Sequence, residues 1–255
     1  MNKHEIPKSH PRYESLHTRG KMEEGMRKSI VAPAGLVAHG RGEAFDYLLG
    51  EKTPPYAAES LKAAAAAFVQ AEHPVISVNG NVAVLVPQGL VELSEVSGAA
   101  LEINLFYRSQ ERMEAIEKVM REAGAINLLG LGEQAKIPEL ESNRRIVDPE
   151  GIYKADLVFV PLEDGDRTEA LVKMGKKVIT VDLNPISRTA RMADITIVDN
   201  ITRVVPALIG EVRKAQLRRE AYTAMHGNGY DNKKHLSEAV AFIADTLQQR
   251  AKELL

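Results

Sequence analysis

Short, continuously apolar runs recur along the middle of the chain, and helix-length segments lie between most of them. The runs span residues 75–78, 101–106, 125–129, 157–161, 177–181 and 195–198. A strand that is apolar throughout is buried on both faces, which is typical of parallel strands joined by crossover helices. The pattern predicts an α/β fold, an open, mostly parallel, Rossmann-like sheet of roughly five or six strands covered by helices on both faces.

The segments before and after these runs are predicted to be helical. Residues 1–73 form a helical N-terminal region with breaks expected at Gly20, Pro33 and 52–55. Residues 74–200 form a nucleotide-binding α/β core, and residues 201–255 form C-terminal helices. A chain of 255 residues can close around one core or divide into two domains. We expect a single α/β domain over 1–255.

Composition removes several classes of protein. The sequence contains no cysteine, which excludes disulfides, thiolate zinc sites, iron–sulfur clusters and cysteine nucleophiles. The formal net charge of -2 gives no general attraction to nucleic acid or to anionic membranes. No apolar run approaches the ~20 residues of a membrane span. We therefore expect a cytoplasmic protein that meets any bound phosphate with local arginines.

The run 177–181 leads directly into the polar tripeptide Asp182-Leu183-Asn184. In open α/β sheets, ligands bind outside the carboxyl ends of the strands. At such a place Asp182 would accept hydrogen bonds from ribose hydroxyls, and Asn184 would bind a base edge or cap a turn. Arg188, followed by Thr189, adds a cation for phosphate. The alternative is an Asx turn with a surface arginine.

A second polar pair, Asp199-Asn200, follows the next apolar run, 195–198. Because successive parallel strands end at the same edge of the sheet, the two pairs are expected to lie close together. Because both polar pairs fall at this edge, a nucleotide site there is as well supported as two independent turns.

Small residues surround one histidine and one arginine in the segment 32–46. Small side chains let the backbone approach a ligand, and Arg41 offers a fork of donors to a phosphate or carboxylate. Close helix packing, with Arg41 paired to Glu43 or Asp46, is an equally supported interpretation. His39 has no partner at metal-ligand spacing, so we do not expect a zinc site.

Three further segments carry weaker signals. Arg19 lies in a helical stretch where most arginines face solvent. Arg108 and Ser109 lie at a predicted helix start. They would hold an anion there, or Ser109 would be a plain N-cap. Asn79-Gly80-Asn81 ends the first strand, where glycine permits a positive φ and close ligand approach, or makes a turn.

The segment Gly130 to Ala135 matches the G-x-G-x-x-A pattern of dinucleotide-binding loops. Its context does not fit, because Pro138 would break the helix that should receive the pyrophosphate. The strand before it is also not the first of the sheet. We therefore do not expect NAD to bind there.

With these segments in hand, the chain resembles the archaeal phosphopantothenate synthetase family, also called 4-phosphopantoate:β-alanine ligase. The resemblance covers nearly the whole length, and its most specific parts are residues 9–16, 31–47 and 181–200. It implies a homodimer. By matching motifs, it implies ATP contacts from Arg19, Arg41, Asp182, Leu183, Asn184, Arg188, Thr189, Asp199 and Asn200.

The resemblance also implies a reaction, the ATP-dependent joining of 4-phosphopantoate to β-alanine. The products would be 4'-phosphopantothenate, AMP and pyrophosphate, on the route to coenzyme A. Adenylation would make the carboxylate an acyl donor, with Mg²⁺ and arginines offsetting the phosphate charge. We expect Asn79, Asn81 and Arg108 at the phosphopantoate end.

Two other functions stay open from the residues alone. One is a nicotinamide-dependent oxidoreductase that uses the Gly130 to Ala135 loop. The other is a nucleotide-sensing protein without catalysis, because the sequence displays binding residues but no unmistakable catalytic acid or base.

Overall fold

The computed structural model describes residues 6–10 and 12–254. Its centre is a six-stranded parallel sheet with the order β3-β2-β1-β6-β7-β8. The strands are β1 (Pro74–Val78), β2 (Ala100–Ile103), β3 (Leu128–Leu129), β6 (Leu157–Phe159), β7 (Lys177–Val181) and β8 (Ile195–Ile197). Each predicted apolar run overlaps one of these strands. The predicted open, parallel, Rossmann-like sheet is therefore confirmed.

Side chains of the central strands alternate between two apolar layers. Phe159 and Ile179 belong to the larger core cluster on one face, whereas Val158 and Val178 belong to a second cluster on the other. Successive residues of a strand point to opposite faces, so a strand covered on both faces is mostly apolar, with buried exceptions such as Glu102 in β2 and Thr180 in β7. This explains the continuous apolar runs.

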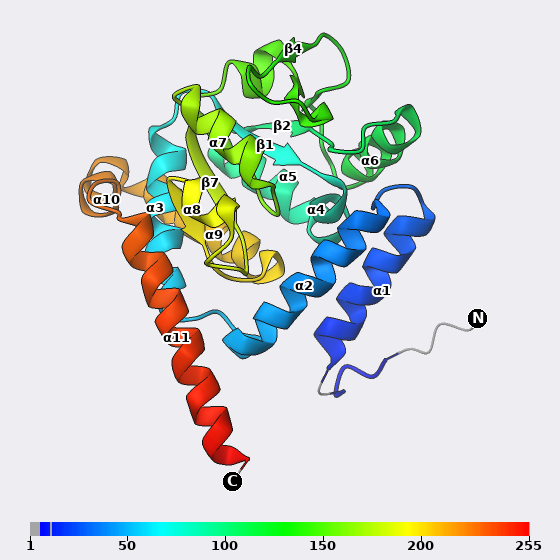
Figure 1. The fold of residues 1–255 in the computed structure, drawn as a ribbon. Coiled ribbons are helices and arrows are strands. Elements are labelled where there is room, and N and C mark those ends of the chain that lie inside the picture. Colours follow the sequence, from blue (N-terminus) through cyan, green and yellow to red (C-terminus); the bar gives the residue numbers. More distant parts are fainter. Residues whose placement is uncertain (1–5, 11, 255) are drawn as a thin grey trace.

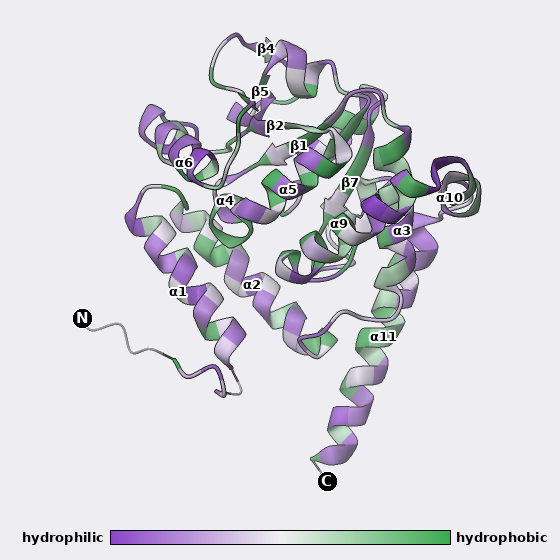
Figure 2. Cartoon of the chain, turned by 180° about the vertical axis from the view of Figure 1, so that it is seen from behind, coloured by the Kyte–Doolittle hydropathy of each residue, from purple (hydrophilic) through white to green (hydrophobic). Residues whose placement is uncertain are grey.

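Helices cover both faces of the sheet (Figure 1). The helices α3 (Ala57–Gln70), α5 (Pro87–Ser97), α6 (Gln110–Glu122) and α9 (Ile201–Leu217) contribute to the larger cluster. The alanines 63–67 of α3 are all buried, and their small side chains let α3 pack closely along α9. The other face carries α7 (Gly165–Lys173) and α8 (Arg188–Met192). Figure 2 shows polar residues gathered on outer helices such as α6.

The N-terminal region is helical as predicted, with one correction. The helix α1 (Tyr13–Arg27) runs through Gly20 without a break, because one glycine in an exposed helix costs only about 1 kcal/mol. Pro33 is the first residue of α2 (Pro33–Leu49), where its missing N–H is harmless. The two helices lie side by side (Figure 1). Residues 1–5 and Pro11, which belong to the predicted N-terminal region, lie outside the described residues.

The C-terminal part also differs slightly from the prediction. Within the C-terminal helices predicted over 201–255, the first helical stretch is divided at Arg218 into α9 and α10 (Arg219–His226). The last helix, α11 (Asn232–Glu253), packs by its first half and then extends away from the sheet (Figure 1). None of the helices in residues 6–10 and 12–254 is both long and apolar enough to span a bilayer.

The segment between β3 and β6 contains elements that the sequence did not predict. A small antiparallel pair, β4 (Ala135–Lys136) with β5 (Ile146–Val147), is followed by the π-helix η2 (Pro149–Tyr153). The glycine pattern at Gly130 to Ala135 leads into β4 and not into a helix. The helix N-terminus that a dinucleotide pyrophosphate needs is therefore absent from this stretch of the described chain, as Pro138 indicates.

Candidate active site

The site lies at the carboxyl ends of the strands, where the strand order reverses between β1 and β6. Two adjoining pockets occupy this edge. The larger pocket has a volume of about 420 Å³ and the smaller pocket about 390 Å³. They share six lining residues, Ala38, Arg41, Asn81, Leu162, Glu163 and Asp164. A ligand in one pocket would therefore contact the wall of the other.

Most of the residues proposed from the sequence as ATP contacts line the larger pocket. They come from α2, from the loop after β7, from the start of α8 and from the residue before α9, and they are Arg41, Asp182, Leu183, Asn184, Arg188, Thr189 and Asn200. Phe45, Leu85, Leu183 and Ile201 add apolar surface to the same pocket. The larger pocket thus combines an apolar surface with cations and hydrogen-bonding groups.

The loop after β7 is built from local turns. The Asn184 N–H donates to Asp182 Oδ1 at 2.9 Å, and the Ile186 N–H donates to Asn184 Oδ1 at 3.0 Å. Burial raises the pKa of Asp182, against the hydrogen bonds from Ser187 and Asn184. The Asx-turn interpretation is therefore correct at both residues. It does not compete with a site, because the same turns present Asp182 and Asn184 to the larger pocket.

Arg188 and Thr189 begin α8 beside the loop after β6. Arg188 is half exposed and forms ion pairs with Asp166 and Glu169 on α7. Thr189 Oγ1 donates to the Glu163 carbonyl at 3.0 Å. A Cβ atom on Gly165 would lie 2.6 Å from Arg188 Cγ, so glycine is what lets these two helices begin so close together. Arg188 is held near the pocket mouth by exposed carboxylates.

Arg41 differs from the other arginines near this edge. It lines both pockets, is exposed, and makes no hydrogen bond or ion pair with any residue in 6–10 or 12–254. The expected alternative partners are taken, since Glu43 pairs with Arg19 at 3.7 Å and Asp46 pairs with Arg203 at 2.5 Å. The interpretation in which Arg41 is salt-bridged to Glu43 or Asp46 is therefore wrong, and its guanidinium is available at the junction of the pockets.

Arg19 and Asp199 do not line either pocket. Arg19 reaches the site only through Glu43, which lines the larger pocket. Asp199 is buried and accepts from Thr53 Oγ1 at 2.7 Å and from Arg203 Nε at 2.8 Å. Asn200 caps α9 through Thr202 N–H at 3.1 Å. In this structure Asp199 supports the wall of the site, whereas Asn200 forms part of it.

Of the three residues expected at the phosphopantoate end, Asn79 and Asn81 line the smaller pocket and Arg108 does not. Asn79 is the N-cap of α4 (Gly80–Leu85), so this segment begins a helix and Gly80 has no positive φ. Asn81 lines both pockets and donates to the Gly35 carbonyl at 3.0 Å. Arg108 donates to the Gly130 carbonyl at 2.8 Å and lines neither pocket. Ser109 next to it is a plain N-cap of α6.

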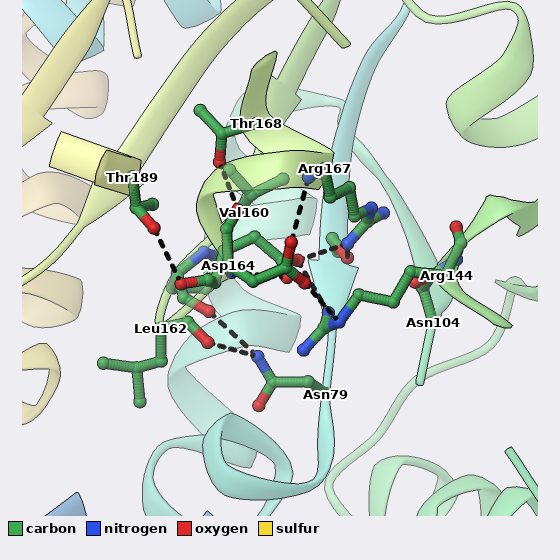
Figure 3. Close-up of polar contacts among 12 residues, drawn as sticks. Asn79, Asn104, Arg144, Val160, Leu162, Asp164, Arg167, Thr168 and Thr189 are labelled. Atoms are coloured by element: carbon green, nitrogen blue, oxygen red, sulfur yellow. Dashed lines mark hydrogen bonds and ion pairs between the residues drawn. The ribbon is translucent and has the colours of Figure 1, made fainter. Parts of the chain in front are cut away.

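Four charged residues of the smaller pocket were not found from the sequence, namely Arg112, Arg144, Glu163 and Asp164. Arg144 donates to Glu163 Oε2 at 2.7 Å, and the fully buried Arg167 donates to the same oxygen (Figure 3). Burial alone would raise the pKa of Glu163, but the two guanidinium groups lower it below its usual value. The floor of the smaller pocket is therefore a charged network.

Histidine and acidic residues do not form a metal cage in the described ranges. No group of three or more such residues there has the arrangement to hold a metal ion. His39 lies on α2 with its Nε2 3.9 Å from Glu43 Oε1, and burial lowers the pKa of His39.

A parallel sheet with a crevice of this size at the switch point of its strand order defines a Rossmann-like α/β protein whose site suits small molecules. The chain belongs to the phosphopantothenate/pantothenate synthetase family, whose model matches residues 56–246. The family resemblance noted in the sequence is thereby confirmed.

Relatives of nearly equal length carry one name, 4-phosphopantoate--beta-alanine ligase. The protein of Thermococcus kodakarensis is 56% identical over 250 residues, which cover 97% of this chain and 95% of that protein. The protein of Methanosarcina mazei is 47% identical over 249 residues, covering 98% of each. The protein of Methanospirillum hungatei is 44% identical over 247 residues, covering 95% of this chain and 98% of that protein.

Proposed function

We propose that this chain is an ATP-dependent ligase that joins 4-phosphopantoate to β-alanine. The products would be 4'-phosphopantothenate, AMP and pyrophosphate, as a step toward coenzyme A. The observation that carries the proposal is full-length similarity of 44–56% to relatives named for this ligation. The two adjoining pockets with Arg41 between them support it, because a ligase must bring a nucleotide and an acid together.

The larger pocket is our candidate for the nucleotide. Its apolar residues Phe45, Leu183 and Ile201 would pack against a base, and Asp182 would accept hydrogen bonds from a ribose. Arg41 and Arg188 would offset phosphate charge. Arg19 would act through Glu43, and Asp199 through Asn200, so these two predicted contacts are proposed as supports of the nucleotide wall.

The smaller pocket is our candidate for the two acids. A carboxylate oxygen of 4-phosphopantoate would attack the α-phosphorus of ATP, and the bond from that phosphorus to the pyrophosphate oxygen would break. The β-alanine nitrogen would then attack the acyl carbon, the carbon–oxygen bond to AMP would break, and the nitrogen would lose a proton. Positioning of the carboxylate at the junction of the pockets would supply much of the rate.

Mg²⁺ would enter this site with the nucleotide. The described residues offer no metal cage of their own, so phosphate oxygens would be its main ligands. Bound there, Mg²⁺ would neutralise charge that develops on the leaving pyrophosphate.

The test is a product assay with a partial-reaction control. The protein is incubated with ATP, Mg²⁺, 4-phosphopantoate and β-alanine, and AMP and the mass of the amide are measured. Radiolabelled pyrophosphate should enter ATP when 4-phosphopantoate is present and β-alanine is absent. Release of ADP in place of AMP would contradict the adenylate and point to an acyl phosphate. Absence of any amide would contradict the ligase.

We further propose that the chain acts as a homodimer. Leu247 in the second half of α11 and Leu254 just after its end are exposed, as an unpaired apolar contact surface would be. Light scattering should give a mass near twice the chain mass of 28.0 kDa. A mass equal to one chain at micromolar concentration would contradict the dimer.

A further inference from the structure

We infer that Asp164 binds the amino group of β-alanine and accepts the proton that this group loses. The inference rests on the proposed function, in which the β-alanine nitrogen attacks an activated acyl carbon. It adds to that function the residue that makes the nitrogen a nucleophile. An ammonium group has no free electron pair, so a group that accepts its proton beside the acyl carbon would speed the attack.

Asp164 lies where three pockets meet. It lines the larger pocket, the smaller pocket and a third pocket of about 300 Å³ that opens beside them. None of the other residues in 6–10 and 12–254 lines all three. With the nucleotide in the larger pocket and 4-phosphopantoate in the smaller, Asp164 would lie beside the bond that forms. The third pocket would then hold the remaining length of β-alanine.

The third pocket differs from the other two in its charge. Besides Asp164, its wall carries two cations and four carboxylates, on Lys173, Arg188, Glu139, Glu141, Asp166 and Glu169. ATP and 4-phosphopantoate are polyanions, which an acid-rich wall repels, whereas β-alanine brings an ammonium group with its single carboxylate. The wall would therefore keep the two polyanions out and admit the zwitterion.

The carboxylate of Asp164 has one oxygen turned inward and one open. Its Oδ2 atom is buried and lies 3.2 Å from Arg144 Nε. Its Oδ1 atom caps α7 by accepting from the Arg167 N–H at 2.9 Å, and it can accept a second hydrogen bond (Figure 3). Because the side chain is 34% exposed although Oδ2 is covered, Oδ1 is the oxygen that faces the pockets.

The loop that carries Asp164 is held from several sides. Leu162 has a positive φ of 55°, which a residue other than glycine keeps only when its surroundings impose it. Asn79 Nδ2 donates to the Pro161 carbonyl at 2.9 Å, and the Asp164 N–H donates to Glu163 Oε1 at 2.9 Å. A carboxylate fixed in this way is in position before the substrates bind.

Two neighbouring groups fit the role less well. Both oxygens of Glu163 are occupied, Oε2 by Arg144 and Arg167 and Oε1 by the Asp164 N–H. His39 lines only the larger of the three pockets, and burial lowers its pKa. Burial and the charge of Glu163 raise the pKa of Asp164, against the N-cap hydrogen bond and the charge of Arg144. A raised pKa makes a carboxylate a stronger base.

The amine loses two protons in this reaction. Asp164 takes one proton from the ammonium group, which leaves an electron pair on the nitrogen. That pair forms the bond to the acyl carbon, the bond from this carbon to the AMP oxygen breaks, and its electron pair leaves on AMP. The nitrogen then loses its second proton to water, and Asp164 passes the first proton to water as the product departs.

The decisive variant is Asp164→Asn, compared with Asp231→Asn as the matched control. Each aspartate is the N-cap of a helix, and asparagine caps a helix equally well, but Asp231 lines none of the three pockets. Exchange of radiolabelled pyrophosphate into ATP is measured with saturating 4-phosphopantoate and no amine. AMP release is measured with β-alanine and with hydroxylamine, which is largely uncharged in neutral solution and needs no proton acceptor before it attacks. His39→Gln is measured in the same way.

Asp164→Asn should keep the pyrophosphate exchange and the hydroxylamine reaction near wild-type rates, and should lose roughly 100- to 10,000-fold in kcat with β-alanine. Asp231→Asn should match wild type in all three measurements. The inference is overturned if Asp164→Asn keeps its rate with β-alanine, or if its exchange or hydroxylamine reaction falls as far. It is also overturned if His39→Gln shows the selective loss instead. A wild-type protein that forms no amide would reject the proposed function itself.

Discussion

Asp46 of α2 and Arg203 of α9 form a two-pronged ion pair that joins the two helices. Arg203 Nη2 lies 2.5 Å from Asp46 Oδ1, and Arg203 Nη1 lies 3.2 Å from Oδ2. Asn200 Nδ2 donates to Asp46 Oδ2 at 2.8 Å. The helix that carries Arg41 is thus tied by one carboxylate to the start of α9, although the two segments are far apart in the sequence.

Asp46→Ala should weaken nucleotide binding although Asp46 would not touch the nucleotide. Loss of the carboxylate leaves Arg203 paired only with Asp199 and frees α2, so we expect a stability loss of about 2 kcal/mol and a KM for ATP raised about tenfold. Chemical denaturation and initial rates measure the two effects. Glu92→Ala removes an exposed ion pair with Arg213 and is the control, with less than about 0.5 kcal/mol expected. Equal effects of both variants would refute this role for Asp46.

Arg41→Ala should reduce ATP affinity without destabilising the fold, because the Arg41 side chain makes no hydrogen bond or ion pair with the described residues and acts only through its charge on Asp182. We expect a roughly 10- to 100-fold weaker affinity, and partial recovery in Arg41→Lys. Calorimetric titration with ATP measures the affinity, and thermal unfolding verifies the fold. An unchanged dissociation constant in Arg41→Ala would remove Arg41 from the nucleotide site.

Gly80→Ala should damage both folding and the smaller pocket. A Cβ atom at Gly80 would lie 2.1 Å from the Ile30 carbonyl oxygen and 2.9 Å from Arg112 Nη2. The backbone would have to shift, at a cost of about 1–3 kcal/mol, and Arg112 would be displaced. Gly20→Ala is the matched control, since nothing lies within 4 Å and helix propensity predicts a gain of up to about 1 kcal/mol. A stability change of the same sign in both variants would disprove the steric argument.

Glu102→Gln should remove a pH dependence of stability. Burial raises the pKa of Glu102 from 4.5 to about 7, against hydrogen bonds from Ile152 and Asp148 N–H. The unfolded chain therefore ionises first as pH rises. This contribution to stability is complete below pH 4.5 and falls by up to about 3 kcal/mol as pH approaches 7. Urea denaturation of the wild-type protein and of Glu102→Gln from pH 5 to pH 8 measures the free energy of unfolding of each. A difference between the two free energies that does not change with pH would show that folded Glu102 binds no extra proton.

The sheet could be predicted from the sequence because both faces of every strand are covered. Val178 and Ile179 belong to different core clusters, so neither position tolerates a polar residue, and the apolar run is visible without a structure. The strands β4 and β5 have two residues each and no such pattern. They depend on distant contacts such as the hydrogen bond from Asn104 to the Ile146 carbonyl at 2.8 Å.

The site was predictable where it follows directly from a strand end. Asp182 and Asn184 come after β7, and parallel strands bring such residues to one edge. Arg112 and Arg144 reach that edge through tertiary packing. Arg108 and Arg112 are four residues apart around a helix start, and only the orientation of α6 places one of them in the pocket. The roles of Asp182, Asn184, Arg112 and Arg144 as ligand contacts stay predictions.

The wall shared by the two pockets has a consequence for ligand design. Because Arg41, Asn81 and Asp164 belong to both pockets, a nucleoside joined by a short, uncharged link to a phosphorylated acid would fill both at once. Such a bisubstrate compound would lose its rotational and translational freedom once, where two separate molecules lose it twice. Its affinity would then exceed that of either half by far more than any added contact explains.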